Sequence, residues 1–374
     1  MSFRELEGGL QCLALEIMPP DACQLSCKNC YKDGKKKRGK HKKMPTEFAE
    51  RVILQAKECG FRSIVFIGGE PTLHSDLPYL IERALGLGLN PIVVTNGYKL
   101  ANELYAKKIS LPGVSLVMHA PLPEDVQDEE VQLKGYSKKL KEAFNNLLNI
   151  RQGQEKNPVR IVAEVVVIKE FAPYIPDMLA WCRKKKIEPF IEFNRNNDFG
   201  QAYEGSALPE EVHDTFRELR ILDQNPQKIL VPPAYGEPCT MSITGLHVKN
   251  FGEEFGMVSS CCAQSIWHGD LRIQSLREVL SDPSMKVFKE QDSWIFGPCK
   301  ECEYYSYCRG GCRGQAYQVF NCPRASCPAC WHIPKEKRND PKIMAPSDCS
   351  GCPLEGDPAC GKIKNKKEIP VRVL

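Results

Sequence analysis

The fold is decided by residues 63–97, which read SIVFIGGEPTLHSDLPYLIERALGLGLNPIVVTNG. The apolar runs at 63–67 and 91–95 have the length and composition of buried strands, and a helix is expected between them from about residue 76 to residue 88. A strand, a helix and a second strand predict parallel neighbours, because parallel strands need a crossover connection. Runs that are apolar throughout suit a parallel sheet, since helices cover its faces.

The same alternation of strands and helices continues on both sides of this unit. Further strands are expected at 13–17, 114–118, 160–168 and 189–193, and helices at 46–60, 98–108, 137–152 and 173–186. The first of these helices should have Thr46 as its N-cap and stop at Gly60. Six such units predict an α/β fold with a parallel sheet. The unusual residues follow strand ends, where ligands bind in such folds.

The composition is that of a globular protein with heavy cysteine usage. The chain has 374 residues, of which 42% are hydrophobic and 19 are cysteines. Its start shows no signal-peptide pattern, and no apolar run approaches the roughly 18 residues that a bilayer span needs. We therefore expect a cytoplasmic protein without a membrane partner. In a reducing cytosol, clustered cysteines bind metals or do redox chemistry more often than they form disulfides.

The formal net charge of +4 hides a basic run at residues 32–43, which contains seven lysines, one arginine and one aspartate. This run is either a solvated loop or a patch that recruits an acidic peptide or a nucleic acid. Aromatic residues that could stack on bases are not interleaved with it, so nucleic acid is a disfavoured partner.

The cysteines concentrate near the end of the chain, where ten of the nineteen fall between Cys299 and Cys360. The strand–helix alternation stops after about residue 200, and long apolar runs are few from Pro226 onward. Metal is therefore expected to replace part of the core. We expect an α/β domain at 1–225, a small cysteine-rich, metal-stabilised domain at 226–335, and a cysteine-containing tail at 336–374.

Three cysteines, Cys23, Cys27 and Cys30, lie in CQLSCKNCY directly after the first expected strand. A structural zinc site normally has four ligands, and the nearest candidate for a fourth is His41, inside the basic run. A four-iron cluster held by three thiolates keeps one iron open to an outside ligand. Three cysteines on a loop at the ligand-binding face therefore predict a four-iron cluster whose open iron binds an outside ligand.

The spacing CxxxCxxC of these cysteines resembles the characteristic motif of the radical SAM family. Two further motifs resemble that family in order and position: FIGGEP at 66–71 after the second strand, and TNG at 95–97 after the third. The resemblance implies a partial (β/α)6 TIM-like barrel. It also implies that S-adenosylmethionine (SAM) binds the open iron of a [4Fe–4S] cluster at the three cysteines.

The same resemblance implies which residues bind SAM. Gly68, Gly69 and Glu70 would lie at its methionine ammonium, because glycines allow close approach and a carboxylate complements an ammonium. Thr95 and Asn96 would lie near its ribose and methionine. The family often has an aromatic residue before the third cysteine, but this chain has Asn29 there, so Tyr31 is the candidate for packing the adenine.

The chemistry that the family resemblance implies is radical chemistry. A reductant such as flavodoxin or ferredoxin would drive cleavage of SAM to a 5'-deoxyadenosyl radical, which abstracts a hydrogen atom from the substrate. Other polar residues at strand ends could bind substrate or SAM, or simply line the barrel: His119, Glu164, Glu192, Asn194 and Arg195.

A second resemblance lies in CKECEYYSYCRGGC, residues 299–312, and in the cysteines around it. Together they resemble the seven-cysteine SPASM extension, which in its full form carries two auxiliary four-iron clusters. The resemblance implies an outer cluster at Cys299, Cys302, Cys308 and Cys330, and an inner cluster at Cys239, Cys261 and Cys312. Two zinc sites on the same cysteines are the alternative.

The inner group lacks one ligand that sulfatase-maturating relatives have, because Gly245 stands at its place. Its cluster would then be open at one iron or ligated by Cys262. Five cysteines remain near the end of the chain: Cys322, Cys327, Cys349, Cys352 and Cys360. The last three, with Cys327 or Cys322, predict a third auxiliary cluster or a zinc site; free thiols on a solvated tail are the alternative.

The layout resembles enzymes that modify peptides or proteins, the sulfatase maturases in particular. We therefore expect oxidative maturation or cross-linking of a peptide or protein side chain or backbone. Those maturases have a catalytic aspartate where this chain has Cys262, which argues against formylglycine formation. A thiol can return a hydrogen atom to a carbon radical, so a radical epimerase or dehydrogenase of a peptide or polar small molecule, with Cys262 as donor, is one alternative. A non-catalytic iron–sulfur electron-transfer protein is another.

Overall fold

The computed structural model describes residues 10–30, 42–194, 204–223 and 241–357. Its sheet contains β1 (Cys12–Met18), β2 (Ser63–Gly68), β3 (Asn90–Thr95), β4 (Ser115–His119), β5 (Arg160–Val167), β6 (Glu188–Phe193), β7 (Leu246–Asn250), β8 (Phe255–Ser259) and β9 (Gly269–Asp270). The longer helices are α1 (Thr46–Glu58), α2 (Leu77–Gly86), α3 (Glu103–Ile109), α4 (Glu124–Val131), α5 (Tyr136–Gln152), α6 (Ile175–Lys185), α7 (Pro209–Leu222) and α13 (Arg313–Phe320).

Short helices connect these elements. The α-helical ones are α8 (Met241–Thr244), α9 (Leu276–Leu280), α10 (Lys286–Lys289), α11 (Gln291–Trp294), α12 (Tyr305–Cys308) and α14 (Pro341–Met344). Single turns of 3-10 helix occur at Pro71–Leu73, Tyr98–Ala101, Ala172–Tyr174, Pro283–Met285 and Gly297–Cys299. None of the described helices is long and apolar enough to cross a membrane.

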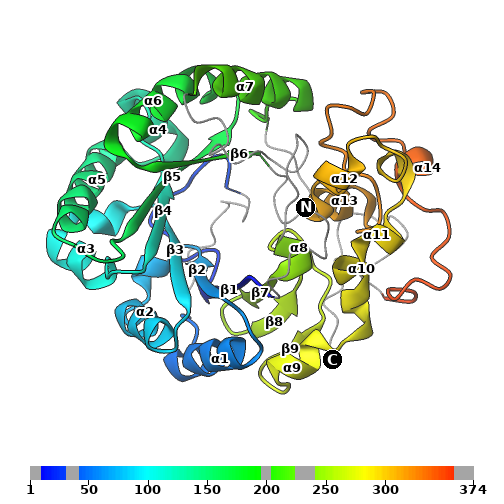
Figure 1. Cartoon of the computed structure of the whole chain (residues 1–374), viewed down its shortest axis with the longest axis horizontal. Coiled ribbons are helices and arrows are strands. Elements are labelled where there is room, and N and C mark those ends of the chain that lie inside the picture. Colours follow the sequence, from blue (N-terminus) through cyan, green and yellow to red (C-terminus); the bar gives the residue numbers. More distant parts are fainter. Residues whose placement is uncertain (1–9, 31–41, 195–203, 224–240, 358–374) are drawn as a thin grey trace.

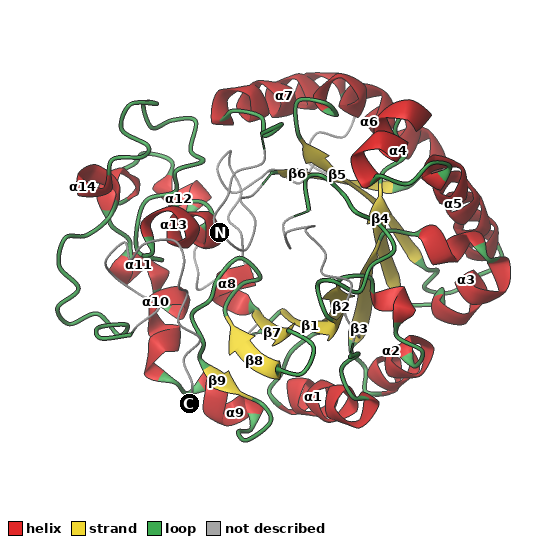
Figure 2. Cartoon of the chain, turned by 180° about the vertical axis from the view of Figure 1, so that it is seen from behind, coloured by secondary structure: helices red, strands yellow, loops and turns green. Residues whose placement is uncertain are grey.

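The first six strands run parallel to their neighbours and follow one another across the sheet in sequence order. The sheet curves into part of a barrel, and α1 to α7 surround its outer side (Figures 1 and 2). Each crossover helix returns the chain to the same end of the sheet, so the loops after the strands gather there. The predicted α/β fold with a partial barrel is therefore confirmed.

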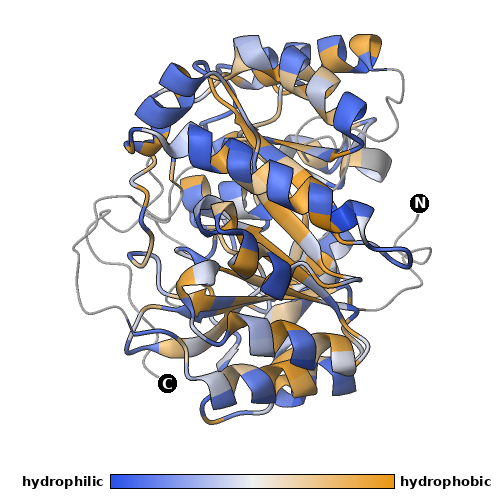
Figure 3. Cartoon of the chain, turned by 90° about the vertical axis from the view of Figure 1, so that its left-hand side faces the viewer, coloured by the Kyte–Doolittle hydropathy of each residue, from blue (hydrophilic) through white to orange (hydrophobic). Residues whose placement is uncertain are grey.

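Side chains along these strands alternate between two environments. Val93 and Leu116 are fully buried under the helices, whereas Ile92, Val94 and Val117 are half-buried and line a cavity inside the barrel. The helices carry hydrophobic residues towards the sheet and hydrophilic residues on their outer surface (Figure 3). In each of these apolar strands, one set of side chains therefore packs against the helices outside the barrel, and the alternate set lines the cavity inside it.

The N-cap residue of helix α1 lies one position earlier than predicted. Pro45 is the N-cap, and the Thr46 hydroxyl instead donates a hydrogen bond to Asp76 Oδ2 at 2.6 Å. The prediction of Thr46 as N-cap is therefore wrong. The predicted stop lies close to the observed one, because Gly60 follows the C-cap residue Cys59 with a φ of 87°, which glycine adopts without strain.

The sheet continues beyond β6 in the sequence, on the side of β1. Strand β7 pairs in parallel with β1, with Leu13 opposite Leu246, and β8 and β9 follow in antiparallel order. The expected end of the strand alternation after about residue 200 is therefore wrong. The sequence of β7, LHVKN, concealed the strand because His247 and Lys249 interrupt its apolar residues, yet both are buried.

The C-terminal elements α10 to α14 lie beside the open side of the barrel (Figure 1). Two small apolar clusters hold this part together. One includes Ile295, Phe320, Cys322 and Met344, and the other includes Phe288, Tyr317, Cys352 and Leu354. The boundaries at residues 225 and 335, and the replacement of core by metal, stay predictions.

Candidate functional site

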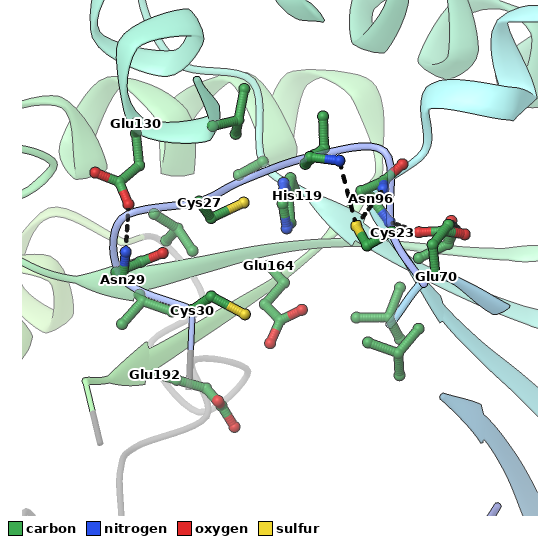
Figure 4. A pocket seen from close by; sticks show the side chains of 18 of the residues that line it. Cys23, Cys27, Asn29, Cys30, Glu70, Asn96, His119, Glu130, Glu164 and Glu192 are labelled. Atoms are coloured by element: carbon green, nitrogen blue, oxygen red, sulfur yellow. Dashed lines mark hydrogen bonds between the residues drawn. The ribbon is translucent and has the colours of Figure 1, made fainter. Parts of the chain in front are cut away.

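The loop after β1 brings Cys23, Cys27 and Cys30 to the wall of one cavity inside the barrel (Figure 4). The cavity has a volume of about 460 Å³ and opens at the ends of the parallel strands. The Cys27 carbonyl accepts a hydrogen bond from the Cys30 amide at 3.3 Å, which closes a tight turn between these two cysteines. The three thiols of the sequence motif therefore share one cavity.

Helix α4 anchors this loop from the side. The Ser26 amide donates to the Val131 carbonyl at 3.1 Å, and the Lys28 amide donates to the Glu130 carbonyl at 2.9 Å. The Asn29 amide donates to Glu130 Oε1 at 2.7 Å, and the Glu130 side chain is buried (Figure 4). Because the last carbonyls of a helix have no intrahelical partners, the end of α4 is free to receive these amides. The sequence did not predict α4 or the role of Glu130.

The two glycines of the GGE motif are required by the start of the cysteine loop. A Cβ at Gly68 would overlap the Met18 carbonyl oxygen, and one at Gly69 would lie 2.5 Å from the Pro19 carbonyl oxygen. Gly68 also has a φ of 143°, a region that residues with a side chain rarely adopt. These glycines let β2 pass directly beneath the loop, whose Ala22 carbonyl accepts a hydrogen bond from the Glu70 amide at 2.8 Å.

Glu70 joins the turns that follow β2 and β3. Its Oε1 accepts hydrogen bonds from Thr72 Oγ1 and Thr95 Oγ1, both at 2.6 Å, and from the Thr72 amide at 3.0 Å. Its Oε2 accepts a hydrogen bond from the Asn96 amide at 2.8 Å. Burial raises the pKa of Glu70, while these hydrogen bonds favour its charged form. The carboxylate therefore holds the GGE and TNG turns together.

Asn96 connects the TNG turn to the cysteine loop. Its Nδ2 donates to Cys23 Sγ at 3.6 Å, and its Oδ1 accepts from Gln24 Nε2 at 3.2 Å. The Tyr98 amide donates to the same Oδ1 at 2.9 Å. Both motifs thus contact the loop that carries the first cysteine.

His119 is positioned by Tyr136 on the neighbouring helix. The Tyr136 hydroxyl donates to the Asn96 carbonyl at 2.5 Å and lies 2.9 Å from His119 Nδ1. A tyrosine hydroxyl has a single proton. Because Tyr136 donates it to the Asn96 carbonyl, His119 Nδ1 must be protonated and donate to the Tyr136 oxygen, which leaves His119 Nε2 as an acceptor. Burial lowers the pKa of His119 to about 4, so the imidazole is neutral at physiological pH.

The opposite wall of the cavity carries acidic residues from β5 and β6. Glu164 and Glu192 line it (Figure 4). Asn194 lines the same cavity. With Glu70 and Glu130, the described lining residues include four carboxylates and neither lysine nor arginine. The described part of this wall therefore presents negative charge to whatever enters the cavity.

Cys262 also lines this cavity, although it lies far from the cysteine motif in sequence. The buried Lys249 side chain donates a hydrogen bond from Nζ to the Cys262 carbonyl. At Gly245, a Cβ would lie 2.7 Å from Met241 Sδ and 2.9 Å from the Cys12 carbonyl. A cysteine would not fit at Gly245 without movement of its neighbours, which gives a packing reason for the missing inner ligand.

The predicted outer group of thiols lines a second, much smaller cavity of about 30 Å³. Its cysteines are Cys299, Cys302, Cys308, Cys327 and Cys330. Burial, together with the neighbouring thiols of Cys330 and Cys299, raises the pKa of the Cys308 thiol to about 12. Cys327, which the sequence offered along with Cys322 as a partner for Cys349, Cys352 and Cys360, also lines this cavity.

Of the predicted inner group, Cys261 and Cys312 lie beside the start of α13. A Cβ at Gly314 would lie 3.4 Å from Cys261 Sγ, and the Gln315 amide donates to Cys312 Sγ at 3.4 Å. Burial raises the pKa of Cys327, and the neighbouring Cys312 thiol raises it further. Cys327 therefore has Cys312 as a neighbour and also lines the small cavity.

Arg313 is a buried cation beside these thiols that the sequence did not reveal. Its Nη1 donates to the Pro323 carbonyl at 3.0 Å and to the Ala325 carbonyl at 2.6 Å. Its Nε is buried and makes no hydrogen bond. The guanidinium lowers the pKa values of Cys308 and Cys327 against the effect of burial. A cation buried beside thiols fits sites where those thiols are deprotonated and hold a metal cluster.

A comparison with family models identifies the barrel. Residues 17–152 match the model described as the radical SAM superfamily. This match makes residues 17–152 a radical SAM domain.

This radical SAM protein has relatives of several activities. It is 22% identical to an AdoMet-dependent heme synthase of Oleidesulfovibrio alaskensis, over 88% of this chain and 90% of the relative. It is also 22% identical to an Fe-coproporphyrin III synthase of Methanosarcina barkeri, over 84% and 86% of the two chains. A GTP 3',8-cyclase of Tolumonas auensis is 24% identical over 64% of this chain and 78% of the relative.

The fold of this radical SAM protein is similar to solved structures of two enzymes. One is anSMEcpe with bound AdoMet and the Cp18Cys peptide, at a TM-score of 0.62 and 18% identity, covering 82% of this chain and 90% of that one. The other is SuiB of Streptococcus suis bound to S-adenosylmethionine, at a TM-score of 0.60 and 18% identity, covering 83% and 74%. At these identities the similarity shows the fold.

The main cavity of this radical SAM protein fits the cofactors of the family. Three thiols and the backbone of the GGE and TNG turns share a cavity whose volume is in the range of small-molecule sites. The described cysteines form no disulfide. Among the same residues, no group of three or more His, Cys, Asp or Glu side chains is arranged to hold a single metal ion.

The structure brings most of the predicted site residues into two places. The main cavity contains Cys23, Cys27, Cys30, Gly68, Gly69, Glu70, Thr95, Asn96, His119, Glu164, Glu192, Asn194 and Cys262. Tyr31, Arg195, Cys239, Cys360 and most of the basic run lie outside the described residues. Cys349 and Cys352 lie apart from both cavities, in the last described segment.

Proposed function

We propose that this radical SAM enzyme removes a hydrogen atom from a side chain or the backbone of a peptide or protein, in an oxidative maturation or cross-linking reaction. The observation that carries the proposal is the shared cavity, in which three thiols of one loop face the GGE and TNG turns at the open end of the barrel. SAM and a [4Fe–4S] cluster are the proposed cofactors, and together they supply a carbon-centred radical by reductive cleavage of SAM.

The chain's own residues would bind and orient these groups. Cys23, Cys27 and Cys30 supply three thiolates and leave one iron for SAM. Glu70 already receives three hydrogen bonds at Oε1 but only the Asn96 amide at Oε2, which leaves Oε2 with acceptor capacity for an ammonium. The cavity walls would exclude water from the radical.

We also propose that the protein binds two auxiliary four-iron clusters. The outer one would use the thiols that line the small cavity, and the inner one would use Cys261, Cys312 and Cys239. Cys327, buried beside Cys312, is the candidate for the missing inner ligand, because Gly245 leaves no space for one. A flavodoxin or ferredoxin is the proposed electron donor.

The charge of the main cavity supports a peptide over an anionic small molecule. Glu164 and Glu192 line the cavity and are assigned neither to SAM nor to the cysteine loop. With no lysine or arginine among the described lining residues, they would repel a triphosphate or a carboxylate-rich tetrapyrrole. It would accept the neutral amides of a peptide backbone or a basic side chain. Peptides are bound in the similar structures of anSMEcpe and SuiB, whereas the sequence relatives are named for haem and nucleotide chemistry.

The first experiment tests for radical chemistry itself. Anaerobically reconstituted protein, supplied with SAM and dithionite, should form 5'-deoxyadenosine, and Cys27→Ala should abolish this because the cluster loses a ligand. Cys59→Ala is the matched control, since Cys59 lies at the end of α1 and lines neither cavity. A reconstituted wild-type protein that forms no 5'-deoxyadenosine would favour the non-catalytic electron-transfer alternative.

A second candidate function follows from the position of Cys262. Its place on the cavity wall would let its thiol return a hydrogen atom to a substrate radical, as a radical epimerase requires. The sulfur radical left behind would take up one electron and one proton, with the electron coming from an auxiliary cluster. The Lys249 hydrogen bond to the Cys262 carbonyl fixes the backbone that carries this thiol.

Cys262→Ala in deuterium oxide separates the two candidates. If Cys262 is the donor, wild-type turnover should incorporate deuterium into the product, and the variant should form 5'-deoxyadenosine while losing that incorporation. Cys262→Ser keeps the size of the residue but has an O–H bond too strong to donate, so it should behave like alanine. A wild-type product that carries no deuterium, and that both variants form unchanged, would leave oxidation or cross-linking as the function.

A further inference from the structure

The GGE and TNG turns are each followed by a short 3-10 helix, and Lys99 joins these two helices. One helix spans Pro71–Leu73 and contains Thr72, and the other spans Tyr98–Ala101 and contains Lys99. Lys99 Nζ donates a hydrogen bond to the Thr72 carbonyl at 2.9 Å. The chain segments that carry the two motifs are therefore connected twice, once through the Glu70 carboxylate and once through Lys99.

Thr72 links Lys99 to the Glu70 carboxylate. The Thr72 amide and hydroxyl both donate to Glu70 Oε1, at 3.0 Å and 2.6 Å. The Thr72 carbonyl accepts two hydrogen bonds, one from Lys99 Nζ and one from the Tyr105 hydroxyl at 3.2 Å. Thr72 and Glu70 are 0% and 1% exposed, so water cannot readily replace these partners. The orientation of the Glu70 carboxylate therefore depends on the groups that hold Thr72.

Helix α3 holds the Lys99 ammonium in place. Lys99 Nζ lies 4.3 Å from the centre of the Tyr105 ring, in a cation–π contact. Tyr105 lies in the first turn of α3, where its amide donates to the side chain of the N-cap residue Asn102 at 2.9 Å. Fixing a lysine side chain costs rotamer entropy. The ring contact and the hydrogen bond together offset that cost and give Lys99 one defined position.

The charge of Lys99 also acts on Glu70. Burial lowers the pKa of Lys99, and the Glu70 carboxylate raises it. The attraction is mutual, so Lys99 favours the ionised form of Glu70, against the burial that raises the pKa of this carboxyl. An ionised carboxylate is the form that binds an ammonium, and Glu70 Oε2 has acceptor capacity left beside the Asn96 amide.

We propose that Lys99 is a positioning residue for SAM, which through Thr72 fixes the Glu70 carboxylate in the orientation that receives the methionine ammonium. Lys99 does not line the main cavity, so it acts through Thr72 and not by contact with the cofactor. The inference rests on the proposed function, in which Glu70 binds that ammonium. It extends the SAM site to a cation that lies outside the three cysteine, GGE and TNG motifs.

SAM binding by the reconstituted full chain tests this role. Lys99→Met removes the ammonium but keeps an unbranched side chain, so the variant should fold and retain its iron. Its dissociation constant for SAM, measured by equilibrium dialysis with radiolabelled SAM, should rise roughly tenfold, because Thr72 and Glu70 lose one of their supports. Lys99→Arg should restore most of the affinity, since a guanidinium can donate to the same carbonyl. Weaker SAM binding at full iron content separates positioning of Glu70 from a general loss of structure.

Lys107→Met is the matched control. Lys107 lies on the surface of α3 and pairs with Glu103 at 2.6 Å, with both side chains more than half exposed, so its loss should leave SAM binding unchanged. Tyr105→Phe removes the other donor to the Thr72 carbonyl but keeps the ring beside Lys99. Combining it with Lys99→Met should weaken SAM binding by more than the product of the two single effects, because the carbonyl then has neither donor.

Two results would overturn the proposal. One is a folded Lys99→Met variant with full iron content that binds SAM as tightly as the wild-type protein. The other is tighter SAM binding by this variant, which would show that Lys99 chiefly repels the ligand ammonium across Glu70. A reconstituted wild-type protein that binds no SAM would instead contradict the proposed function, so the two failures are distinguishable.

Discussion

Gly68 and Gly69 show how strongly a single residue depends on chain that is distant in sequence. The family motif accounts for them by the approach of SAM, but the structure shows that the first atoms they must accommodate are backbone oxygens of the cysteine loop. The same close approach places Glu70 beside Ala22, and the Ala22 carbonyl accepts a hydrogen bond from the Glu70 amide. The glycines therefore position the cysteine loop as well as the GGE turn.

Gly69→Ala should weaken both the fold and the cluster site. Its new Cβ would overlap the Ala22 carbonyl oxygen and lie 2.5 Å from that of Pro19, so the loop must shift. We expect a loss of roughly 1–3 kcal/mol in the free energy of unfolding, as for other overpacked positions. The checks are urea denaturation and the iron retained after reconstitution.

The control for this substitution is Gly86→Ala, at the end of helix α2, where a Cβ would meet nothing within 4 Å. It should be neutral or slightly stabilising, because alanine loses less backbone entropy on folding. Equal stability and iron content in the two variants would contradict the packing role of Gly69.

At the scale of elements, the cysteine loop depends on a helix that local sequence did not indicate. Helix α4 reads EDVQDEEV, is short and mostly acidic, and has only Gln127, Glu130 and Val131 buried. Its contribution comes from its last carbonyls and one side chain, which receive three amides of the loop. Such contacts between segments about 100 residues apart leave no periodic pattern in the sequence.

Glu130→Ala should loosen the cysteine loop without unfolding the barrel. The half-buried Asn29 amide would lose its charged acceptor, the buried Glu130 side chain, which costs roughly 1–3 kcal/mol. We expect faster loss of iron from the radical SAM site on dilution with a chelator. Iron release can be followed by absorbance and compared with the rate in the wild-type protein.

Glu129→Ala is the matched control for this experiment. Glu129 forms an ion pair with Lys28 at 2.6 Å, but its side chain is 75% exposed, so the pair should contribute less than about 1 kcal/mol. Iron release should therefore stay at the wild-type rate. If both variants released iron equally, the buried hydrogen bond would not be the anchor of the loop.

At the scale of the whole molecule, β7 joins the C-terminal part of the chain to the barrel through a buried polar network. Glu16 Oε1 on β1 accepts a hydrogen bond from His247 Nε2 at 2.7 Å. Lys249 Nζ lies 3.7 Å from the same carboxylate oxygen. The Asn250 amide donates to the other oxygen at 3.1 Å. Burial lowers the pKa of His247, so Lys249 is the charge that balances Glu16.

Glu16→Ala should destabilise the joint between β1 and β7. Lys249 would remain buried without its carboxylate, and breaking a buried pair from one side costs roughly 3–5 kcal/mol. Because Lys249 also holds the Cys262 carbonyl, we expect Cys262 to react faster with iodoacetamide. Urea denaturation and alkylation kinetics measure the two effects.

A surface carboxylate serves as the comparison. Glu253 pairs with Lys42 at 2.6 Å and its side chain is 80% exposed, so Glu253→Ala should leave the free energy of unfolding nearly unchanged. A small effect of Glu16→Ala, similar to that of Glu253→Ala, would mean that Lys249 finds another partner and that the network does not hold β7.

The sequence by itself determined the parallel α/β barrel and the cysteine loop of a radical SAM protein. Both follow from local sequence patterns. Apolar runs of strand length between helices indicate the barrel, and cysteines at short spacings indicate the loop. The strand β7 was hidden, because its two buried charged or titratable residues, His247 and Lys249, are compatible with a core only in contact with Glu16 on β1.

Only the tertiary structure decided which distant residues share a site. It placed Cys262 in the main cavity, and Cys327 in the small cavity with the outer group of thiols. It also placed the buried guanidinium of Arg313 beside the thiols of Cys308 and Cys327. The physical reason is the same in each case: spacing along the chain determines which cysteines of one turn can act together, whereas packing of remote segments determines their neighbours, their burial and the charge that balances them.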